Sequence, residues 1–449
     1  MKINSLLIEN LYGKDFHLTF FEDVTILTGL NGSGKTSILN ILALICQGKI
    51  QNVIKFDFNK LELHYTVKNK EKTLVIKKDV ENGDRYEAIV DSNIEHFYIK
   101  KDRFESKYIE SKYVESSSFY NGSSSFTNNK KDLDGKQSLK QMINEDLSCI
   151  YIPLSRKINL NKPREIRIER RSNNFQNNID ESTYECEQYL CEYIRWIKFK
   201  ENRTYNLTQK LILKKFFSTT ASIDTKNIKR ENFKINEKEK ELLLKYDLKD
   251  SFDTVLREYT DTISYLNNNN NSLNELIKIE HYVRHLIAYE QLKKFNIILE
   301  FIDQRHRKIN ELNNEISTLE ENINFFFKDT KKKILLSDLN NLSGGKVEFK
   351  NLETLHESNV LKLSSGEKQL FIMLVASLIT DTNRLDKNRI LIIDEPELSL
   401  HIEWQSNLLE TMINNIGKQQ LIIATHSPEI VGYYDEKCIE VKGVYRNEY

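Results

Sequence analysis

The segment Gly29–Thr36 holds residues whose types and spacing suit the binding of a phosphate chain. It reads G-x-x-x-x-G-K-[ST]: its glycines let backbone N–H groups converge on phosphate oxygens, and a following helix adds partial positive charge. We expect Lys35 to reach the β- and γ-phosphates of a nucleotide and the Thr36 hydroxyl to ligate Mg²⁺. The predicted phosphate-binding residues are Asn31, Gly32, Ser33, Gly34, Lys35, Thr36 and Ser37.

Two further segments place acid–base groups directly after short apolar runs. Asp394 and Glu395 follow the run Ile390–Ile393, and His426 follows a run that begins at Leu421. We expect Asp394 to serve the metal ion and Glu395 to polarise an attacking water molecule as general base. His426 would sense or bind the γ-phosphate. Adjacent carboxylates after a strand often mark only a turn. Here the phosphate-binding segment Gly29–Thr36, a P-loop, lies upstream and favours a catalytic pair.

Two segments are candidates for a second phosphate-contacting motif, called the signature motif below. Such a motif must open a helix whose N-terminus points at a γ-phosphate. Leu342–Gly345 precedes a β-like segment and is interpreted as a hairpin turn. Leu363–Gln369 precedes the apolar helical run Leu370–Ile379, with Ser364 as N-cap and Glu367 three residues later. The predicted signature contacts to nucleotide are Ser364, Ser365, Gly366 and Glu367.

The elements that must position these groups can be predicted from apolar patterns. Val24–Leu27 suits a buried parallel strand and Ile38–Cys46 an apolar-faced helix, which gives the strand, loop and helix that a P-loop needs. Residues 54–67, 72–79 and 86–100 favour a meander of antiparallel strands. The predicted fold is an α/β P-loop NTPase, a mixed sheet with flanking helices, carrying an inserted α-helical or coiled-coil domain. The resemblance of its motifs to those of ABC-type ATPases, given below, implies that the NTPase is of ABC type.

The middle of the chain has the composition of long helices. No glycine occurs between Gly135 and Gly344, and no proline between Pro163 and Pro396. A stretch with alternating three- and four-residue spacing indicates a coiled-coil seam, interrupted by the charge of Arg305. Its apolar positions are Phe295, Ile298, Ile302, Ile309, Leu312, Ile316, Leu319, Ile323 and Phe326. The stretch Leu242–Leu266 offers a partner face, with a turn at Asn267–Asn271.

The predicted domains are 1–154 for the N-terminal half of the ATPase lobe, 155–327 for the helical insertion, and 328–449 for the C-terminal half. Two interpretations of the insertion stay open: a structural element, or an arm that docks a protein or DNA. The basic runs Arg156–Arg171 and Arg195–Lys215 fit phosphate contact or a solvated helix face. His281 and His285 lack the glutamate of a zinc protease and are assigned to packing or surface.

Composition excludes several classes of protein. Lysine plus arginine equals aspartate plus glutamate over 449 residues, so no global charge favours nucleic acid or an anionic membrane. The five cysteines form no C-x-x-C pair, which fits reduced thiols and not a zinc hook. The longest apolar run is about half the ~20 residues that span a bilayer. These features predict a cytoplasmic protein that does not enter a membrane.

The motifs together resemble ABC-type ATPases of the SMC/RecF/OLD-like branch. The resemblance rests on Gly29–Thr36, Leu363–Gln369, Ile390–Pro396, Glu397–His401 and Thr425–Pro428. It implies ATP and Mg²⁺ as cofactors, hydrolysis of ATP to ADP and phosphate, and a homodimer or higher homo-oligomer that sandwiches two ATP molecules. Lys35 and Thr36 of one protomer would then face Ser365 and Gly366 of the other, with Glu397–His401 as a dimer-contacting loop.

Within that branch the chain looks like the ATPase subunits of bacterial anti-phage systems such as PARIS and Septu. This resemblance implies a switch that senses phage infection and controls a separate toxic effector, expected to be a nuclease. The alternative is a RecF/SMC-like repair ATPase with DNA as partner. A transporter subunit is disfavoured because such subunits lack a long helical insertion. Too few residues follow His426 for an OLD-type nuclease domain, and neither Gln137 nor Gln141 is a convincing Q-loop glutamine.

Overall fold

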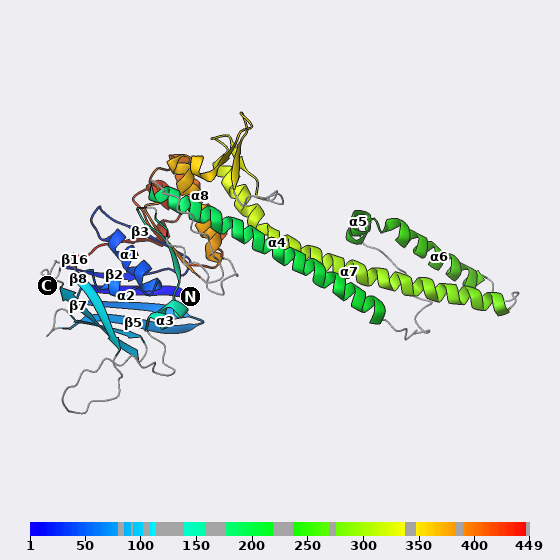
Figure 1. The fold of residues 1–449 in the computed structure, drawn as a ribbon, viewed down its shortest axis with the longest axis horizontal. Coiled ribbons are helices and arrows are strands. Elements are labelled where there is room, and N and C mark those ends of the chain that lie inside the picture. The colour runs from blue at the N-terminus through cyan, green and yellow to red at the C-terminus, as the bar shows by residue number, and fades with distance from the viewer. Residues whose placement is uncertain are drawn as a thin grey trace, which may run out of the picture. The chain divides into compact units, whose positions relative to one another are not determined.

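A computed structural model gives the architecture of the chain (Figure 1). It describes residues 1–79, 85–90, 93–101, 107–113, 139–155, 157–158, 177–218, 237–268, 275–336, 347–381 and 389–445. These residues divide into two compact units: unit 1 comprises Met1–Cys191 and Thr318–Tyr449, and unit 2 comprises Glu192–Ser317. Each unit is described separately below. The predicted domain boundaries at 154/155 and 327/328 stay a prediction.

A five-stranded parallel sheet forms the centre of unit 1, with the strand order β15-β3-β14-β13-β9. Because every neighbouring pair is parallel, the carboxyl ends of the strands lie along one edge. That edge carries the segments that the sequence predicts to be functional. The strands are β3 (Val24–Thr28), β9 (Cys149–Ile152), β13 (Ile390–Asp394), β14 (Leu421–Ala424) and β15 (Cys438–Glu440).

Helices pack against this sheet. Ile390 and Ile392 of β13 belong to the same buried cluster as the apolar residues of α1 (Lys35–Cys46), which places α1 on their face. Because side chains alternate along a strand, the intervening residues of β13 point to the other face. The helix α8 (Ser365–Asp381) also contacts β13, and α9 (Ile402–Ile416) packs on α8. Shorter helices of unit 1 are α2 (Ile50–Val53), α3 (Leu139–Asp146) and α10 (Pro428–Val431), with 3-10 turns at Val360–Lys362 and Asp435–Lys437.

An eight-stranded antiparallel sheet, in the order β16-β2-β1-β4-β5-β6-β7-β8, forms the second layer of unit 1. The predicted antiparallel meander is confirmed by the ladders β4·β5, β5·β6 and β6·β7. Parallel and antiparallel strands are thus divided between two sheets. The strands are β1 (Lys2–Leu11), β2 (Lys14–Thr19), β4 (Lys60–Val67), β5 (Lys70–Lys78), β6 (Arg85–Val90), β7 (Asn93–Lys101), β8 (Lys107–Tyr113) and β16 (Val444–Tyr445).

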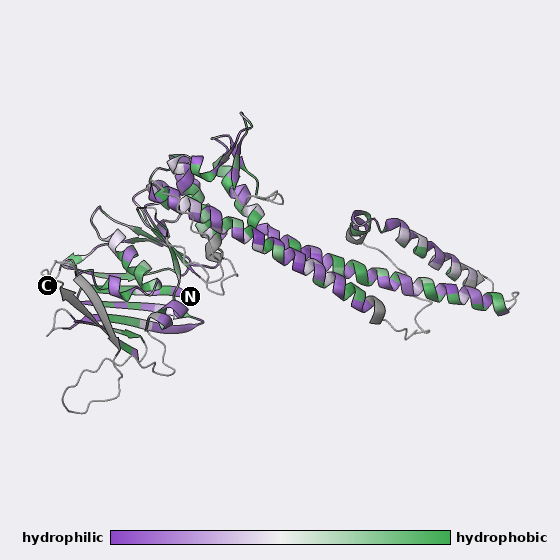
Figure 2. Cartoon of the chain, in the orientation of Figure 1, coloured by the Kyte–Doolittle hydropathy of each residue, from purple (hydrophilic) through white to green (hydrophobic). Residues whose placement is uncertain are grey.

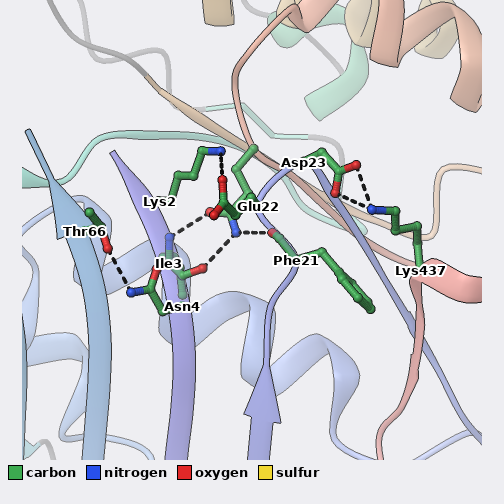
Figure 3. Close-up of polar contacts among 9 residues, drawn as sticks. Lys2, Ile3, Asn4, Phe21, Glu22, Asp23, Thr66 and Lys437 are labelled. Carbon is green, nitrogen blue, oxygen red and sulfur yellow. Dashed lines mark hydrogen bonds and ion pairs between the residues drawn. The ribbon is translucent and has the colours of Figure 1, made fainter. Parts of the chain in front are cut away.

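A buried amide joins the two sheets. Gln420, just before β14, is fully buried; its Nε2 donates to the carbonyls of Ile3 (2.9 Å) and Phe21 (2.7 Å), and its Oε1 accepts from the Ile3 N–H (2.8 Å). Figure 3 shows these contacts, with the ion pairs Lys2–Glu22 and Asp23–Lys437 nearby. One side chain therefore fixes β14, which leads to His426, against the first strand of the chain.

A small three-stranded sheet, in the order β10-β11-β12, follows the long helix α7. Phe327, in the turn after α7, packs against Phe349 of β11 (ring centroids 5.1 Å apart), and Phe349 packs edge-on against Phe371 of α8 (6.2 Å). These aromatic contacts connect the end of α7 to the helix of the signature motif. The strands are β10 (Lys332–Ile334), β11 (Glu348–Asn351) and β12 (Glu357–Asn359).

Unit 2 is helical throughout its described residues. Figure 2 shows hydrophilic and hydrophobic bands along α4 and α7, as expected for helices with one apolar face. Two of its four helices, α4 and α7, also have residues in unit 1. The helices are α4 (Asn178–Ser218), α5 (Glu237–Lys245), α6 (Lys249–Asn268) and α7 (Glu275–Phe326).

The helix α7 contains the predicted seam and has two successive partners in unit 2. The predicted partner stretch Leu242–Leu266 is confirmed: Phe252 of α6 lies edge-on to Phe295, with ring centroids 5.5 Å apart. Nearer its C-terminal end α7 pairs with α4, where Tyr193 donates to Glu315. The sequence pattern did not identify α4 as this second partner. Arg305 lies where the partners meet: it stacks on Tyr205 of α4 and donates to the Tyr246 hydroxyl (2.5 Å).

Some expectations fall outside the described residues: the Leu342–Gly345 segment, Arg156, Gln137 and most of Arg156–Arg171. None of the five cysteines, all of which are described, forms a disulfide. Within the described residues, no helix combines the length and the apolar character that crossing a bilayer demands.

Candidate nucleotide site

The loop between β3 and α1 has the backbone shape that phosphate binding needs. Gly29, Gly32 and Gly34 all have positive φ angles (144°, 77° and 105°), which side chains strongly disfavour. A Cβ on Gly29 would lie 3.0 Å from Ser33 Oγ and 3.1 Å from the Val441 carbonyl oxygen. No side chain caps the N-terminus of α1, and its first turn has no acidic residue. The backbone N–H groups there can therefore donate hydrogen bonds to a bound anion.

Lys35 is held at the centre of this loop. Its ammonium donates to the carbonyl oxygens of Gly29 (2.9 Å) and Leu30 (3.2 Å). Burial lowers the pKa of Lys35, and the negative charges of Glu395, Asp394 and Glu397 oppose that effect. The lysine thus lies in the field of the three carboxylates that follow β13, with its ammonium bonded to neutral carbonyls that a phosphate can replace.

The P-loop and the end of β13 meet in the structure. Thr36 Oγ1 lies 3.4 Å from Asp394 Oδ1, although the two residues are 358 positions apart in sequence. Asp394 is fully buried. Glu395, the next residue, has a φ of 48°, and its N–H donates to the Ala424 carbonyl of β14 (2.8 Å). A non-glycine residue in this left-handed region costs free energy and is typical of functional turns.

Glu397 links the turn after β13 to the turn after β14. Its carboxylate accepts from the Thr425 hydroxyl (2.8 Å) and from the backbone N–H of His426 (2.7 Å). The backbone of His426 is therefore fixed relative to Glu395, while its imidazole stays exposed. Sequence reasoning placed Glu397 in a dimer-contacting loop and missed this contact. The available signal was a second acidic residue only two positions after the predicted base.

The signature segment forms the predicted capping box. The Ser364 N–H donates to Glu367 Oε2 (2.8 Å), and the Glu367 N–H donates to Ser364 Oγ (3.3 Å). Glu367 is only 2% exposed, whereas Ser364 and Ser365 are exposed. The carboxylate of Glu367 is thus committed to the helix start, and its predicted contact to nucleotide stays a prediction. Among the described residues, no hydrogen bond or ion pair joins Ser364–Glu367 to the P-loop of the same chain.

The start of α8 is fixed by neighbours on three sides. Lys332 of β10 donates to both oxygens of Glu367 (2.8 Å each), and Lys368 donates to Asp180 of α4 (2.7 Å). Gln369 donates from Nε2 to the Pro396 carbonyl (2.9 Å). Gly366 lies so close to the turn after β13 that a Cβ would approach the Ser399 carbonyl oxygen to 2.4 Å. The signature is thus joined to α4, to β10, which follows α7, and to the turn that carries Glu395.

The residues present fit a magnesium–nucleotide. Ser33 Oγ is buried and has no hydrogen-bond partner within the described part of the chain. A phosphate oxygen would supply that partner. The same phosphate would also accept hydrogen bonds from the uncapped N–H groups at the start of α1. The hydroxyl of Thr36 and the carboxylate of Asp394 form the kind of oxygen pair that Mg²⁺ prefers. The strand order, the loop and the two acidic residues define a P-loop nucleotide-binding protein.

Comparison with known proteins gives the family. The chain belongs to the AAA ATPase domain family, whose model matches residues 1–431. A probable ATPase of retron Ec83 from Escherichia coli is 28% identical over 144 residues, covering 28% of this chain and 27% of that protein. A probable ATPase of retron Vc95 from Vibrio cholerae serotype O1 biovar El Tor is 26% identical over 212 residues, covering 43% and 40%. The matches thus span less than half the length of these relatives.

The expected ATPase domain is therefore confirmed. Among solved structures, an Smc head domain with an extended coiled coil from Pyrococcus furiosus matches with 11% identity and a TM-score of 0.39, covering 96% of this chain and 91% of that one. An SMC head domain from Thermotoga maritima matches with 9% identity and a TM-score of 0.37, covering 99% and 98%.

Proposed function

We propose that the chain is an ATP-driven dimeric switch of a bacterial defence system, which senses phage infection and controls a separate toxic effector. The proposed dimer is supported by the way the nucleotide site is divided within one chain. The P-loop meets Asp394 within one chain, whereas the exposed Ser365 has no bond to that P-loop. A second copy would complete the site by placing its own signature against the nucleotide.

The residues of this chain have distinct tasks in the proposed reaction. The P-loop N–H groups and Lys35 would bind the phosphates, and Thr36 and Asp394 would hold Mg²⁺. When bound, Mg²⁺ neutralises charge on the β- and γ-phosphates. Glu395 would accept a proton from the attacking water, and His426 would contact the γ-phosphate at the backbone position that Glu397 maintains.

The contacts at the start of α8 would transmit the state of the nucleotide to the helical insertion. Glu367 binds Lys332, which follows α7, and the adjacent Lys368 binds Asp180 in the first turn of α4. A nucleotide that attracts the partner's signature would pull on both attachments. This supports the interpretation of the insertion as an arm that reports ATP binding to an effector, for which we propose a nuclease.

The defence setting is supported by relatives. Both curated relatives are described as retron ATPases, which agrees with the resemblance to ATPase subunits of anti-phage systems. Because the matched segments are partial, sensing and effector control remain proposals for this chain. Co-purification of the chain with the product of a neighbouring nuclease gene, and loss of that complex on ATP addition or infection, would support them.

Mixing two inactive variants tests the shared site. Lys35→Ala removes a phosphate contact, and Ser365→Arg blocks the signature. In a mixed dimer one of the two sites receives both an intact P-loop and an intact signature. We expect an equimolar mixture to recover about a quarter of wild-type ATPase activity, since half of the dimers are mixed and each has one good site. No recovery, with dimers shown by light scattering, would contradict the shared site.

A second candidate function, action on DNA, is favoured by one surface of α4. Residues 192–218 carry seven lysines or arginines against two glutamates, whereas residues 275–317 of α7 carry seven of each sign. Arg195, Arg203 and Lys210 form no ion pair with another described residue. Phe199 between them is 63% exposed and lines a groove of 320 Å³ with Arg203 and Lys210. Basic side chains around an exposed ring suit a nucleic-acid strand.

This candidate is tested with labelled single-stranded and duplex DNA at low and high salt. A double variant, Arg203→Glu with Lys210→Glu, should weaken binding, and binding should fall steeply with salt. The control is Lys293→Glu on the charge-balanced α7, where the lysine is also exposed. Equal binding by both variants would remove this surface from any role with DNA.

A further inference from the structure

Tyr151 is a buried polar residue next to the proposed magnesium site that the functions assigned above do not use. It is the third residue of β9, the edge strand beside β13, and is 8% exposed. Its hydroxyl oxygen is buried and has no hydrogen-bond partner among the described residues. A buried hydroxyl without a partner costs free energy, so native proteins nearly always satisfy it with protein, water or ligand.

The register of the sheet places this side chain on the face that carries the nucleotide loop. Tyr151 pairs with Ile392, so it shares a face with Asp394, two residues further along β13. Tyr151, Ile392 and the buried residues of α1 belong to one cluster, and α1 begins with Lys35 and Thr36. Burial raises the pKa of the Tyr151 phenol, and the charge of Asp394 raises it further.

We propose that Tyr151 is a positioning residue for the metal site: its hydroxyl hydrogen-bonds a water molecule that belongs to the shell of Mg²⁺ beside Asp394. The phenol has no direct bond to a described protein group, and a water molecule is the usual partner of a buried polar group that the protein itself does not satisfy. The neutral phenol can donate one hydrogen bond and accept others. It would thus orient a metal-bound water without adding charge. This inference rests on the proposed function.

The phenol would act through the groups that would hold the metal directly. Thr36 and Asp394 are the direct candidates, 3.4 Å apart. Groups in the outer shell of a metal site fix the geometry of the inner one, and their loss typically costs about 10–100-fold in metal affinity or activity. Removal of the Tyr151 hydroxyl should therefore change the dependence on Mg²⁺ more than the affinity for ATP itself.

The test compares Tyr151→Phe with Tyr65→Phe. Tyr65 is another buried tyrosine of unit 1, but its hydroxyl bonds Asp146 (3.4 Å), outside the proposed site. Binding of a fluorescent ATP analogue is measured while free Mg²⁺ is varied, and again in EDTA. We expect Tyr151→Phe to need about tenfold more Mg²⁺ for half-maximal binding, with unchanged affinity in EDTA. Tyr65→Phe should match the wild type in both.

Thermal unfolding without nucleotide separates positioning from packing. Tyr151→Phe removes a hydroxyl without a described partner, so its melting temperature should equal or exceed that of the wild type; Tyr65→Phe should melt lower. This inference alone would be overturned if wild-type binding of the ATP analogue depends on Mg²⁺ and Tyr151→Phe shows the same dependence. The proposed metal site, and this inference with it, would be overturned by two results together: wild-type ATP binding that does not depend on Mg²⁺, and an Asp394→Asn variant that binds ATP as the wild type does.

Discussion

The two units of the molecule hold their polar residues in different ways. In unit 1 polar groups that are fully or partly buried form specific pairs between separate segments, such as Glu367 with Lys332 and Glu397 with the Thr425 hydroxyl. In unit 2 the helices are held by an apolar seam, and Arg305 lies between two tyrosine rings. The difference indicates that the chemistry of unit 1 depends on the positions of a few polar atoms, whereas the stability of unit 2 depends on continuous apolar contact along its helices. Changes in unit 1 should therefore affect the reaction first, and changes in unit 2 the stability first.

The largest effect is expected from Glu395→Gln. The amide retains the size of the side chain but cannot accept a proton from water, so turnover should fall by about 10²–10⁴-fold while ATP binding persists. Closed dimers should accumulate with ATP, because hydrolysis would no longer open them. Turnover is measured as phosphate release and the dimer by light scattering. An unchanged rate of phosphate release would remove Glu395 from the mechanism.

A smaller effect is expected from Gly366→Ala, which tests the contact between the signature and the turn after β13. The new Cβ would lie 2.4 Å from the Ser399 carbonyl oxygen, so one of the two segments must shift. We expect a loss of roughly 1–3 kcal/mol in stability from overpacking. A shift of the signature should also reduce ATP turnover about tenfold.

The control for that variant is Gly13→Ala, where the φ angle is 86° but a Cβ meets nothing within 4 Å. It should lower stability through backbone strain and leave turnover per folded molecule near that of the wild type. Denaturant unfolding and phosphate release, measured on the same preparations, separate the two effects. Turnover losses of equal size in both variants would show that the Gly366 contact has no special role.

Much of the nucleotide lobe could be predicted from the sequence because its requirements are local. Positive φ at Gly29, Gly32 and Gly34 demands glycine, and a buried parallel strand demands an apolar run before Asp394. The meeting of Thr36 with Asp394 follows from parallel strands sharing one edge. The pairing of Lys332 with Glu367 has no such local requirement. It joins segments 35 positions apart, and no spacing rule distinguishes this lysine from the many exposed ones.

Unit 2 shows the same limit of sequence-based prediction. The seam of α7 was visible as a three–four spacing, and the partner α6 has a strongly amphipathic pattern. The polar contacts of α7 with α4 give no such spacing signal: Tyr193 donates to Glu315, and Glu201 accepts from Asn313. Tyr151 was missed for a related reason. In a four-residue strand whose members are all buried, a single hydroxyl gives no periodic signal.

Arg305→Ala tests how far unit 2 depends on its own packing. Arg305 is buried, stacks on Tyr205 and Tyr246, and donates to the Tyr246 hydroxyl. Loss of these contacts should destabilise unit 2 by about 2 kcal/mol. Hydrogen exchange of α4, α6 and α7 should rise, while the dissociation constant for ATP stays unchanged. An altered ATP affinity would show that the two units are coupled more strongly than their separate packing suggests.

The smallest effect is expected from Glu367→Gln, and pH makes it diagnostic. Burial alone would raise the pKa of Glu367, but hydrogen bonds from Lys332 and the Ser364 N–H outweigh it, and the net pKa lies below its ordinary value of 4.5. A carboxylate with a depressed folded-state pKa stabilises the protein above its unfolded pKa, and this contribution is lost as pH falls through the folded one. We expect the wild type to exceed the variant by roughly 1 kcal/mol at pH 7.

That difference should shrink below pH 4.5, where the carboxylate begins to take up a proton in the unfolded chain. Glu22→Gln is the matched control, because the Lys2–Glu22 pair has the same 2.8 Å distance but Glu22 is 86% exposed. Water screens an exposed pair, so that variant should be nearly as stable as the wild type across the same pH range. Denaturant unfolding of all three proteins from pH 7 downwards measures both differences. Equal pH dependence in the two variants would mean that burial does not strengthen the pair at the signature, and that Lys332 contributes to α8 through the position of its backbone alone.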